Sequence, residues 1–174
     1  MTDSTYEGRA SSHLKNDDKW SRAAFSIFSV TLTPQEITER LGLQPTGTHE
    51  KGRPKGVRRK DGSISPLIVW KDSAWHLNAP LKKDQSLAEH IKWLLDVLEP
   101  KRDAIKSLSS ECTLIRFFCG FSSGNRQGGF SLDDQTLARL SKLGFPLVLD
   151  LYPPSDPEEE VDLAREDSSM DRFN

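Results

Sequence analysis

Six cations are concentrated between residues 51 and 60 of the chain, namely Lys51, Arg53, Lys55, Arg58, Arg59 and Lys60. Gly52, Pro54 and Gly56 interrupt them and exclude a helix, so the segment cannot act as a recognition helix in the DNA major groove. As an extended arm it could contact phosphates without reading a base sequence. Three interpretations stay open: a solvated loop, an anion- or nucleic-acid-binding arm, or a partner for the acidic C-terminal residues.

The residues around these cations argue against nucleic acid as the first choice. Few aromatic residues are interleaved with them, so the sequence predicts no platform on which single-stranded bases would stack. The isoelectric point of about 6.1 is also low for a dedicated nucleic-acid-binding protein. Nucleic-acid contact is therefore kept as an alternative.

A second candidate for anion binding is the glycine-rich segment SSGNRQGGFS, residues 122–131. It joins a predicted strand to a predicted helix, and backbone N–H groups at such a junction can receive an anion. Arg126 would add a positive charge. The segment lacks the Lys-Ser/Thr pair of a P-loop, and its glycines do not match the dinucleotide-binding spacing. A connection made of tight turns is the favoured interpretation of this segment, and an anion site is the alternative.

Residues of the types that catalyse reactions or bind metals are present, but their spacing matches none of the usual catalytic or metal-binding motifs. No histidine among His13, His49, His76 and His90 lies at helical or Cys-x-x-Cys spacing from a second ligand. There is no Gly-x-Ser-x-Gly turn, and neither Cys112 nor Cys119 falls at a predicted helix start. The sequence predicts no metal site, no cofactor and no enzymatic activity.

One pair of residues is compatible with a ligand-binding groove. Trp75 and His76 are adjacent in a predicted strand, and half-exposed aromatic side chains either cover a sheet or line a ligand groove. An unrecognised enzyme that uses this pair is the third functional hypothesis.

The elements that would position these residues alternate along the chain. Apolar runs predict strands at 23–32, 65–70, 74–79, 112–121 and 145–152, with the second and third forming a hairpin. Capping boxes at Thr33 and Ser86, and a third cap in 131–134, predict helices at 34–42, 87–98 and 134–144, with a kink at Pro100. This order predicts an α+β fold: a mainly antiparallel sheet with helices on one face, in a ferredoxin-like (split β-α-β) arrangement.

Composition sets the domain boundaries. The chain has 174 residues and a net charge of −2. Residues 156–174 contain eight acids and two arginines, a net of −6, so residues 1–155 carry +4. We expect a disordered N-terminus at 1–21, one α+β domain at 22–153 and an acidic disordered tail at 154–174. No apolar run is long enough to span a membrane and no signal peptide is apparent, which predicts a cytoplasmic protein without membrane contact.

Several motifs resemble one known family. They are T-P-x-E-I at 33–37, L-G-L-x-P-T at 41–46, SAWHLN at 73–78 and L-x-x-L-E-P at 95–100. With the strands between and after them, residues 25–152 are similar to the bacterial family catalogued as domain of unknown function 4279. The resemblance implies a small α+β protein and brings no activity, substrate or catalytic residue with it.

The sequence thus favours a bacterial, non-enzymatic protein-interaction module, immunity- or adaptor-like, with an unknown protein partner. The alternative is an anion or nucleic-acid binder that uses residues 51–60 together with Arg126.

Overall fold

A computed structural model describes residues 19–55, 57–58, 64–65, 69–124 and 128–152 of the chain. The helices are α1 (Pro34–Leu41), α2 (Leu87–Leu98), the 3-10 turn η2 (Glu99–Lys101), α3 (Arg102–Leu108) and α4 (Asp134–Leu143). The strands are β1 (Lys19–Ser29), β2 (Gly47–His49), β3 (Val57–Arg58), β4 (Ile64–Ser65), β5 (Ser73–Asn78), β6 (Leu114–Ser123) and β7 (Leu147–Tyr152).

Five strands form one sheet in the order β2-β5-β1-β6-β7. The pairs β2–β5, β5–β1 and β1–β6 are antiparallel, and β6–β7 is parallel. The predicted α+β class with a mainly antiparallel sheet is confirmed. Long β1, apolar at alternate positions on the helix side, is the central strand.

The connections between strands include a split β-α-β unit, and they also add a strand to the ferredoxin-like arrangement. Both β1 and β2 run antiparallel to β5, which lies between them, so β1-α1-β2 is a split β-α-β unit. The full ferredoxin-like arrangement is not confirmed, because α4 leads to a fifth strand, β7, that pairs parallel with β6 at the sheet edge.

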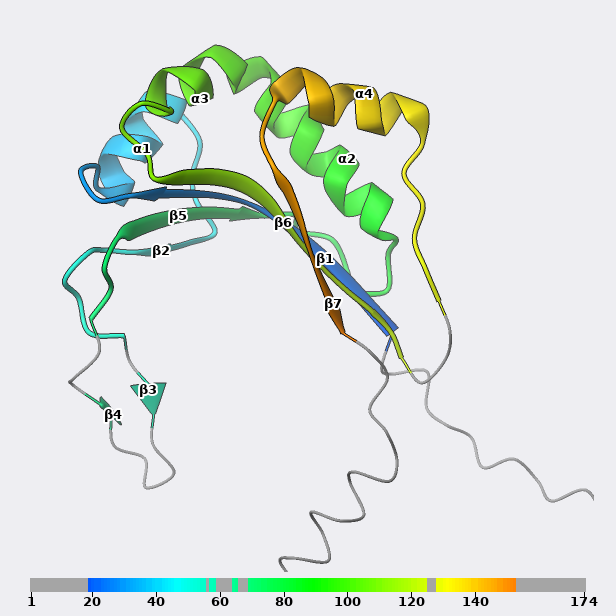
Figure 1. Cartoon of the computed structure of the whole chain (residues 1–174), viewed down its shortest axis with the longest axis horizontal. Coiled ribbons are helices and arrows are strands. Elements are labelled where there is room, and N and C mark those ends of the chain that lie inside the picture. Colours follow the sequence, from blue (N-terminus) through cyan, green and yellow to red (C-terminus); the bar gives the residue numbers. More distant parts are fainter. Residues whose placement is uncertain (1–18, 56, 59–63, 66–68, 125–127, 153–174) are drawn as a thin grey trace, which may run out of the picture.

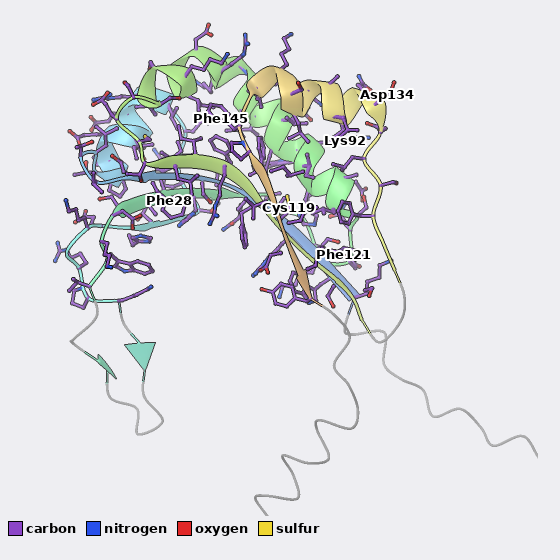
Figure 2. All side chains as sticks on the ribbon, viewed as in Figure 1. Phe28, Lys92, Cys119, Phe121, Asp134 and Phe145 are labelled. Carbon is purple, nitrogen blue, oxygen red and sulfur yellow. The ribbon has the colours of Figure 1, made fainter. Side chains whose placement is uncertain are left out.

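The helices cover one face of the sheet, and the sheet bends away from them so that the other face is concave (Figure 1). Alternate residues of β1 (Ala23, Phe25 and Ile27) point into the core beneath the helices. Phe25 packs edge-on against Phe117 and Phe145, with ring centroids 5.1 and 5.7 Å apart, and Figure 2 shows Phe145 between the helices and the sheet. This leaves β1 residues 20, 22, 24, 26 and 28 on the helix-free face.

Local sequence signals fix the helix ends. Thr33 and Ser86 form the predicted capping boxes with Glu36 and Glu89. The third cap differs: Asp133, rather than Ser131, accepts the N–H of Thr136 at 2.7 Å and begins α4.

Beyond the sheet, the strand pair β2–β5 continues as an antiparallel extension, whose described residues 50–55, 57–58, 64–65 and 69–72 we call the arm. The pairing of β2 with β5 continues through the bridge Pro54–Val69 to the pair β3–β4. The predicted hairpin between 65–70 and 74–79 is therefore wrong. Trp70 instead exchanges backbone hydrogen bonds with Gly52 and Arg53, at 2.8 and 3.0 Å. The arm descends from the sheet on the side opposite the helices (Figure 1).

Candidate functional site

A hollow of about 560 Å³ opens on the helix-free face of the sheet. Its floor comes from the outward-facing residues of β1, β5 and β6, and residues 79–83 form part of its wall. The side chains that bring chemistry to it are Arg22, Ser26, Phe28, His76, Arg116 and Phe118. We call this the open-face hollow.

His76 lies at the centre of the open-face hollow. Its Nδ1 is 2.9 Å from Oγ of Ser26 on the adjacent strand, and its ring meets Phe28 edge-on at 5.6 Å. Burial, with smaller contributions from the nearby His49 and Arg116, lowers the pKa of His76. At neutral pH the imidazole is therefore uncharged and can donate or accept a hydrogen bond.

Arg116 is the cation at the centre of this face. Its guanidinium carbon lies 5.5 Å from the centroid of Phe28 and 5.1 Å from that of Phe118, within cation–π range of both. Its Nε is buried and has no hydrogen-bond partner among the described residues. A buried donor without a partner costs free energy, and because this Nε has almost no surface open to solvent, an acceptor from a ligand reaches it only when the Arg116 side chain shifts.

The arm joins the face through a stack of three side chains. His49 stacks on Trp70 with ring centroids 3.6 Å apart and planes 15° apart, and Nζ of Lys55 lies 4.5 Å over the same indole. Nε2 of His49 is 3.7 Å from Asp72, too far for a hydrogen bond. Burial outweighs the nearby carboxylate and lowers the pKa of His49.

The opposite end of the face carries a second aromatic and cationic group. The rings of Trp20 and Tyr152 are 4.8 Å apart, and Arg22 lies 5.1 Å over the indole. Arg22 also donates to the Tyr152 hydroxyl at 3.3 Å, which in turn donates to Asp150 at 2.7 Å. Gly120 makes room for this group: a Cβ there would meet Nε of Arg22 at 2.7 Å and the Trp20 ring at 2.8 Å.

This arrangement suits binding better than covalent catalysis. Ser26 is only 3% exposed, and within the described part of the chain no carboxylate hydrogen-bonds to His76 to orient it as a base. Burial raises the pKa of the Cys119 thiol to about 12, so it is not a ready nucleophile. Cations and aromatic faces over a neutral imidazole are instead suited to an anion that carries a planar ring.

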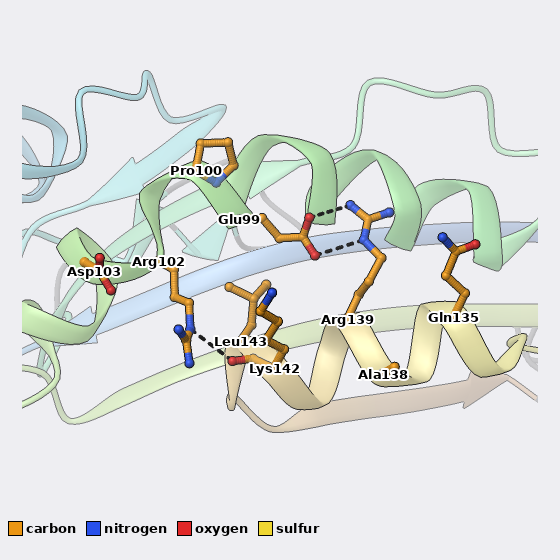
Figure 3. Close-up of a pocket in the computed structure, with 9 residues that line it drawn as sticks. All are labelled: Glu99, Pro100, Arg102, Asp103, Gln135, Ala138, Arg139, Lys142 and Leu143. Carbon is orange, nitrogen blue, oxygen red and sulfur yellow. Dashed lines mark hydrogen bonds and ion pairs between the residues drawn. The ribbon is translucent and has the colours of Figure 1, made fainter.

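A second hollow of about 560 Å³ lies in the helix layer, between the α2–α3 junction and α4 (Figure 3). Glu99, Arg102 and Arg139 of its lining already have partners. Arg139 forms two hydrogen bonds with Glu99 and one with Asp96, and Arg102 donates to the Lys142 carbonyl at the end of α4. These contacts join two helices and explain the residues without a ligand.

The structure places the predicted cations of the arm as follows. Lys51, Arg53 and Lys55 are exposed, with Lys51 donating to the Val30 carbonyl and Arg53 3.5 Å from Glu50. The backbone of Arg58 belongs to β3, while Arg59, Lys60 and Arg126 lie outside the described residues. Few aromatic residues are interleaved with the cations in sequence, but the facing strand of the arm supplies one, because Lys55 lies over Trp70.

The predicted groove pair is divided between the two faces of the sheet. Trp75 is 0% exposed beneath the helices and donates its indole N–H to Thr38 at 3.1 Å, so it does not line the groove. Only His76 does so. Adjacent residues of a strand point to opposite faces, which makes a groove formed by both side chains impossible here.

Sequence reasoning missed Phe28, Arg116 and Phe118 as site residues. The signal was present: Arg116 and Phe118 alternate with the buried Phe117 and Cys119 and so share the outer face of β6. What could not be read from one strand was that Phe28 of β1 would lie within cation–π range of Arg116.

Two general properties follow from the described residues. None of their helices is both long and apolar enough to cross a membrane. In the same residues, no three His, Cys, Asp or Glu side chains gather closely enough to hold a metal ion.

Comparison with known proteins gives a single finding. Residues 18–154 match the model of the family described as domain of unknown function DUF4279. No curated protein and no solved structure matches the chain significantly. The match covers most of the chain, including every strand and helix of the structure, and the chain therefore belongs to the DUF4279 family.

Proposed function

We propose that this protein is a non-enzymatic binding domain, and that its open-face hollow takes an organic anion that carries a planar ring. The observation that supports this most strongly is Arg116, a cation over Phe28 and Phe118 whose buried Nε has no partner among the residues that the structure describes. A ligand with an anionic oxygen and a flat ring would satisfy both the donor and the aromatic surface.

The size and charge of the open-face hollow support the same class of ligand. Its volume of about 560 Å³ lies within the range of small-molecule sites. Arg22, Lys83 and Arg116 line it, and the described residues contribute no carboxylate to its walls. An anion would therefore meet three positive charges, and a neutral His76 would leave room for a hydrogen bond without adding a fourth.

A titration with adenosine monophosphate tests this proposal, because that probe combines a planar ring with a phosphate. We expect binding by calorimetry, weaker binding of adenosine and of inorganic phosphate alone, and a loss of about tenfold or more in Arg116→Gln. Lys106→Gln, which removes the same charge from exposed α3, is the matched control and should leave affinity unchanged. Equal effects of the two variants would contradict the proposal.

A protein-interaction role is the second candidate, and the edge strand β7 favours it. Among the described strands β7 pairs with β6 alone, and its Leu149 and Leu151 are 41% and 60% exposed. An exposed apolar edge can accept a strand from another protein. A partner that co-purifies with the wild-type chain and is lost with Leu151→Lys would support this role; equal recovery by both would count against it.

A further inference from the structure

We infer that the natural ligand of the open face is a single-stranded nucleic acid, lying along the face from the arm to the ends of β1 and β7. The inference rests on the proposed function and extends it, because one ring-bearing anion fills one position whereas the face offers several. The repeated pairing of an aromatic ring with a cation along one concave surface carries the inference.

Three such positions occur along the face. At the arm, Lys55 and His49 flank Trp70. In the middle, Arg116 lies over Phe28 and Phe118; at the far end, Arg22 lies over Trp20 beside Tyr152. Single strands bind through such repeats, because every base has a flat face for stacking and every nucleotide has a phosphate.

The length of the surface exceeds what one nucleotide can cover. Trp20 and Phe28 lie on the same face of β1 and are eight residues apart, about 26 Å along the strand. The arm then extends the surface beyond Phe28, through the His49–Trp70 stack. This span suits on the order of four or more nucleotides, the lower end of site sizes for single-strand-binding domains.

The side chains exposed on the concave face favour a single-stranded nucleic acid over a duplex. Phe28, Phe118 and Arg116 are partly exposed on the concave face, and the exposed fraction of Tyr152 is 41%. Aromatic rings and the guanidinium plane bind unpaired bases by stacking, which a closed duplex does not offer. The described helices all cover the opposite face of the sheet, so none is available to enter a major groove from this side (Figure 1).

Charge is distributed to match a polyanion. Lys51, Arg53 and Lys55 are exposed on the arm, and Arg116 and Arg22 follow along the sheet. Three carboxylates lie among them: Glu50 is 3.5 Å from Arg53, Asp150 accepts from Tyr152, and Asp72 is 3.7 Å from Nε2 of His49. A single-stranded nucleic acid lying along the face would therefore meet positively charged side chains from one end to the other.

Fluorescence anisotropy with labelled mixed-sequence single strands of about four and about twelve nucleotides tests the inference. The same full-length chain is titrated with adenosine monophosphate and with a duplex of the longer sequence. We expect affinity to rise about tenfold or more from the mononucleotide to the longer strand, with the duplex clearly weaker. RNA and DNA versions of the strand show which of the two sugars is preferred.

A variant on the arm, outside the open-face hollow, separates a strand from a mononucleotide: Lys55→Gln should weaken binding of the longer strand about threefold or more and leave binding of the mononucleotide unaffected. Tyr152→Ala should also weaken binding of the longer strand about threefold or more, but it removes a partner of Arg22, which lines the hollow, so it is compared on the longer strand alone. Lys55→Gln should also lower the salt dependence of binding by about one phosphate contact. Leu137→Ala, at an exposed position on α4, is the control, and thermal unfolding verifies that each variant is folded.

The outcomes distinguish this inference from the proposed function. If adenosine monophosphate binds and Arg116→Gln abolishes binding, but longer strands bind no more tightly, the strand inference is overturned and the proposed function stands. Equal binding of duplex and single strand would also overturn it. If neither the nucleotide nor the strands bind, both fail.

Discussion

At the residue scale, the planar guanidinium of Arg116 matters as much as its charge. A lysine ammonium carries the same charge but has no flat surface to lie over Phe28 and Phe118. We therefore predict that Arg116→Lys lowers the affinity for ring-bearing anions about tenfold and lowers the affinity for inorganic phosphate much less. Calorimetry with adenosine monophosphate and with phosphate measures the difference; equal losses for the two ligands would show that only charge matters.

Three histidines give the protein a predictable response to mild acid. Burial lowers the pKa of His49, His76 and His90. Because their folded pKa lies below the unfolded value, the unfolded chain binds protons first as pH falls. Stability should therefore be full above about pH 7 and decline as pH falls below about 6.5.

Thermal unfolding as a function of pH measures this response. His76→Gln removes one of the titrating groups, so the decline between about pH 6.5 and 5 should become shallower. The carboxylates act at lower pH: hydrogen bonds from Ser86 lower the pKa of Glu89, so its contribution is lost only below about pH 4.5. A melting temperature that stays constant down to pH 5 would contradict the assignment of these histidines as neutral.

The sequence predicted His76 as a groove residue and three cations on the arm, namely Lys51, Arg53 and Lys55. In the structure His76 lines the open-face hollow, and the three cations are exposed on the arm. Lys55 gains an aromatic partner only because pairing across the arm brings Trp70 beside it. Such a contact depends on which strands pair, and residue type alone does not reveal it.

At the scale of elements, helix starts were the most predictable feature. Ser86 accepts the N–H of Glu89, and the Glu89 carboxylate accepts the N–H of Ser86 at 2.8 Å. We predict that Ser86→Ala lowers the free energy of unfolding by about 1 kcal/mol, since α2 loses one side of its capping box. Chemical denaturation measures this, with Ser107→Ala, an exposed serine within α3, as the control; an equal loss in both would contradict the cap's role.

Gly120 has a steric role in β6 that the sequence did not indicate. We predict that Gly120→Ala lowers the free energy of unfolding by about 1–3 kcal/mol, because the new methyl group displaces Arg22 and the Trp20 ring. Tryptophan fluorescence should change as the Trp20–Tyr152 contact is disturbed. Gly129→Ala is the control, because among the described residues no atom other than those of its chain neighbours lies within 4 Å of its added Cβ. Similar stability of both variants would contradict this role of Gly120.

Strand pairing was the least predictable feature of the elements. The apolar runs around Trp70 and Trp75 suggested a hairpin between them, whereas residues 69–78 continue in one direction and pair with 47–54. Both alternatives bury similar side chains locally. The choice is made by long-range hydrogen bonds such as that from the Trp70 N–H to the Arg53 carbonyl.

On the scale of the whole molecule, alternating strands and capped helices were enough to predict the α+β class and the helix-covered face. They were not enough to predict that the other face would be concave and lined with rings and cations. That surface combines residues from β1, β5, β6, β7 and the arm, so it exists only once the sheet order is known.

The most direct test of the central claim maps ligand contacts on the folded chain by amide NMR. Under the present account, adenosine monophosphate shifts the amide signals of outward-facing sheet residues around Ser26, His76 and Arg116, while signals of α1 and α3 stay in place. Shifts concentrated around Glu99 and Arg139 in the helix layer, or along the β7 edge, would contradict the open face as the binding site, and so would the absence of any shift at saturating ligand.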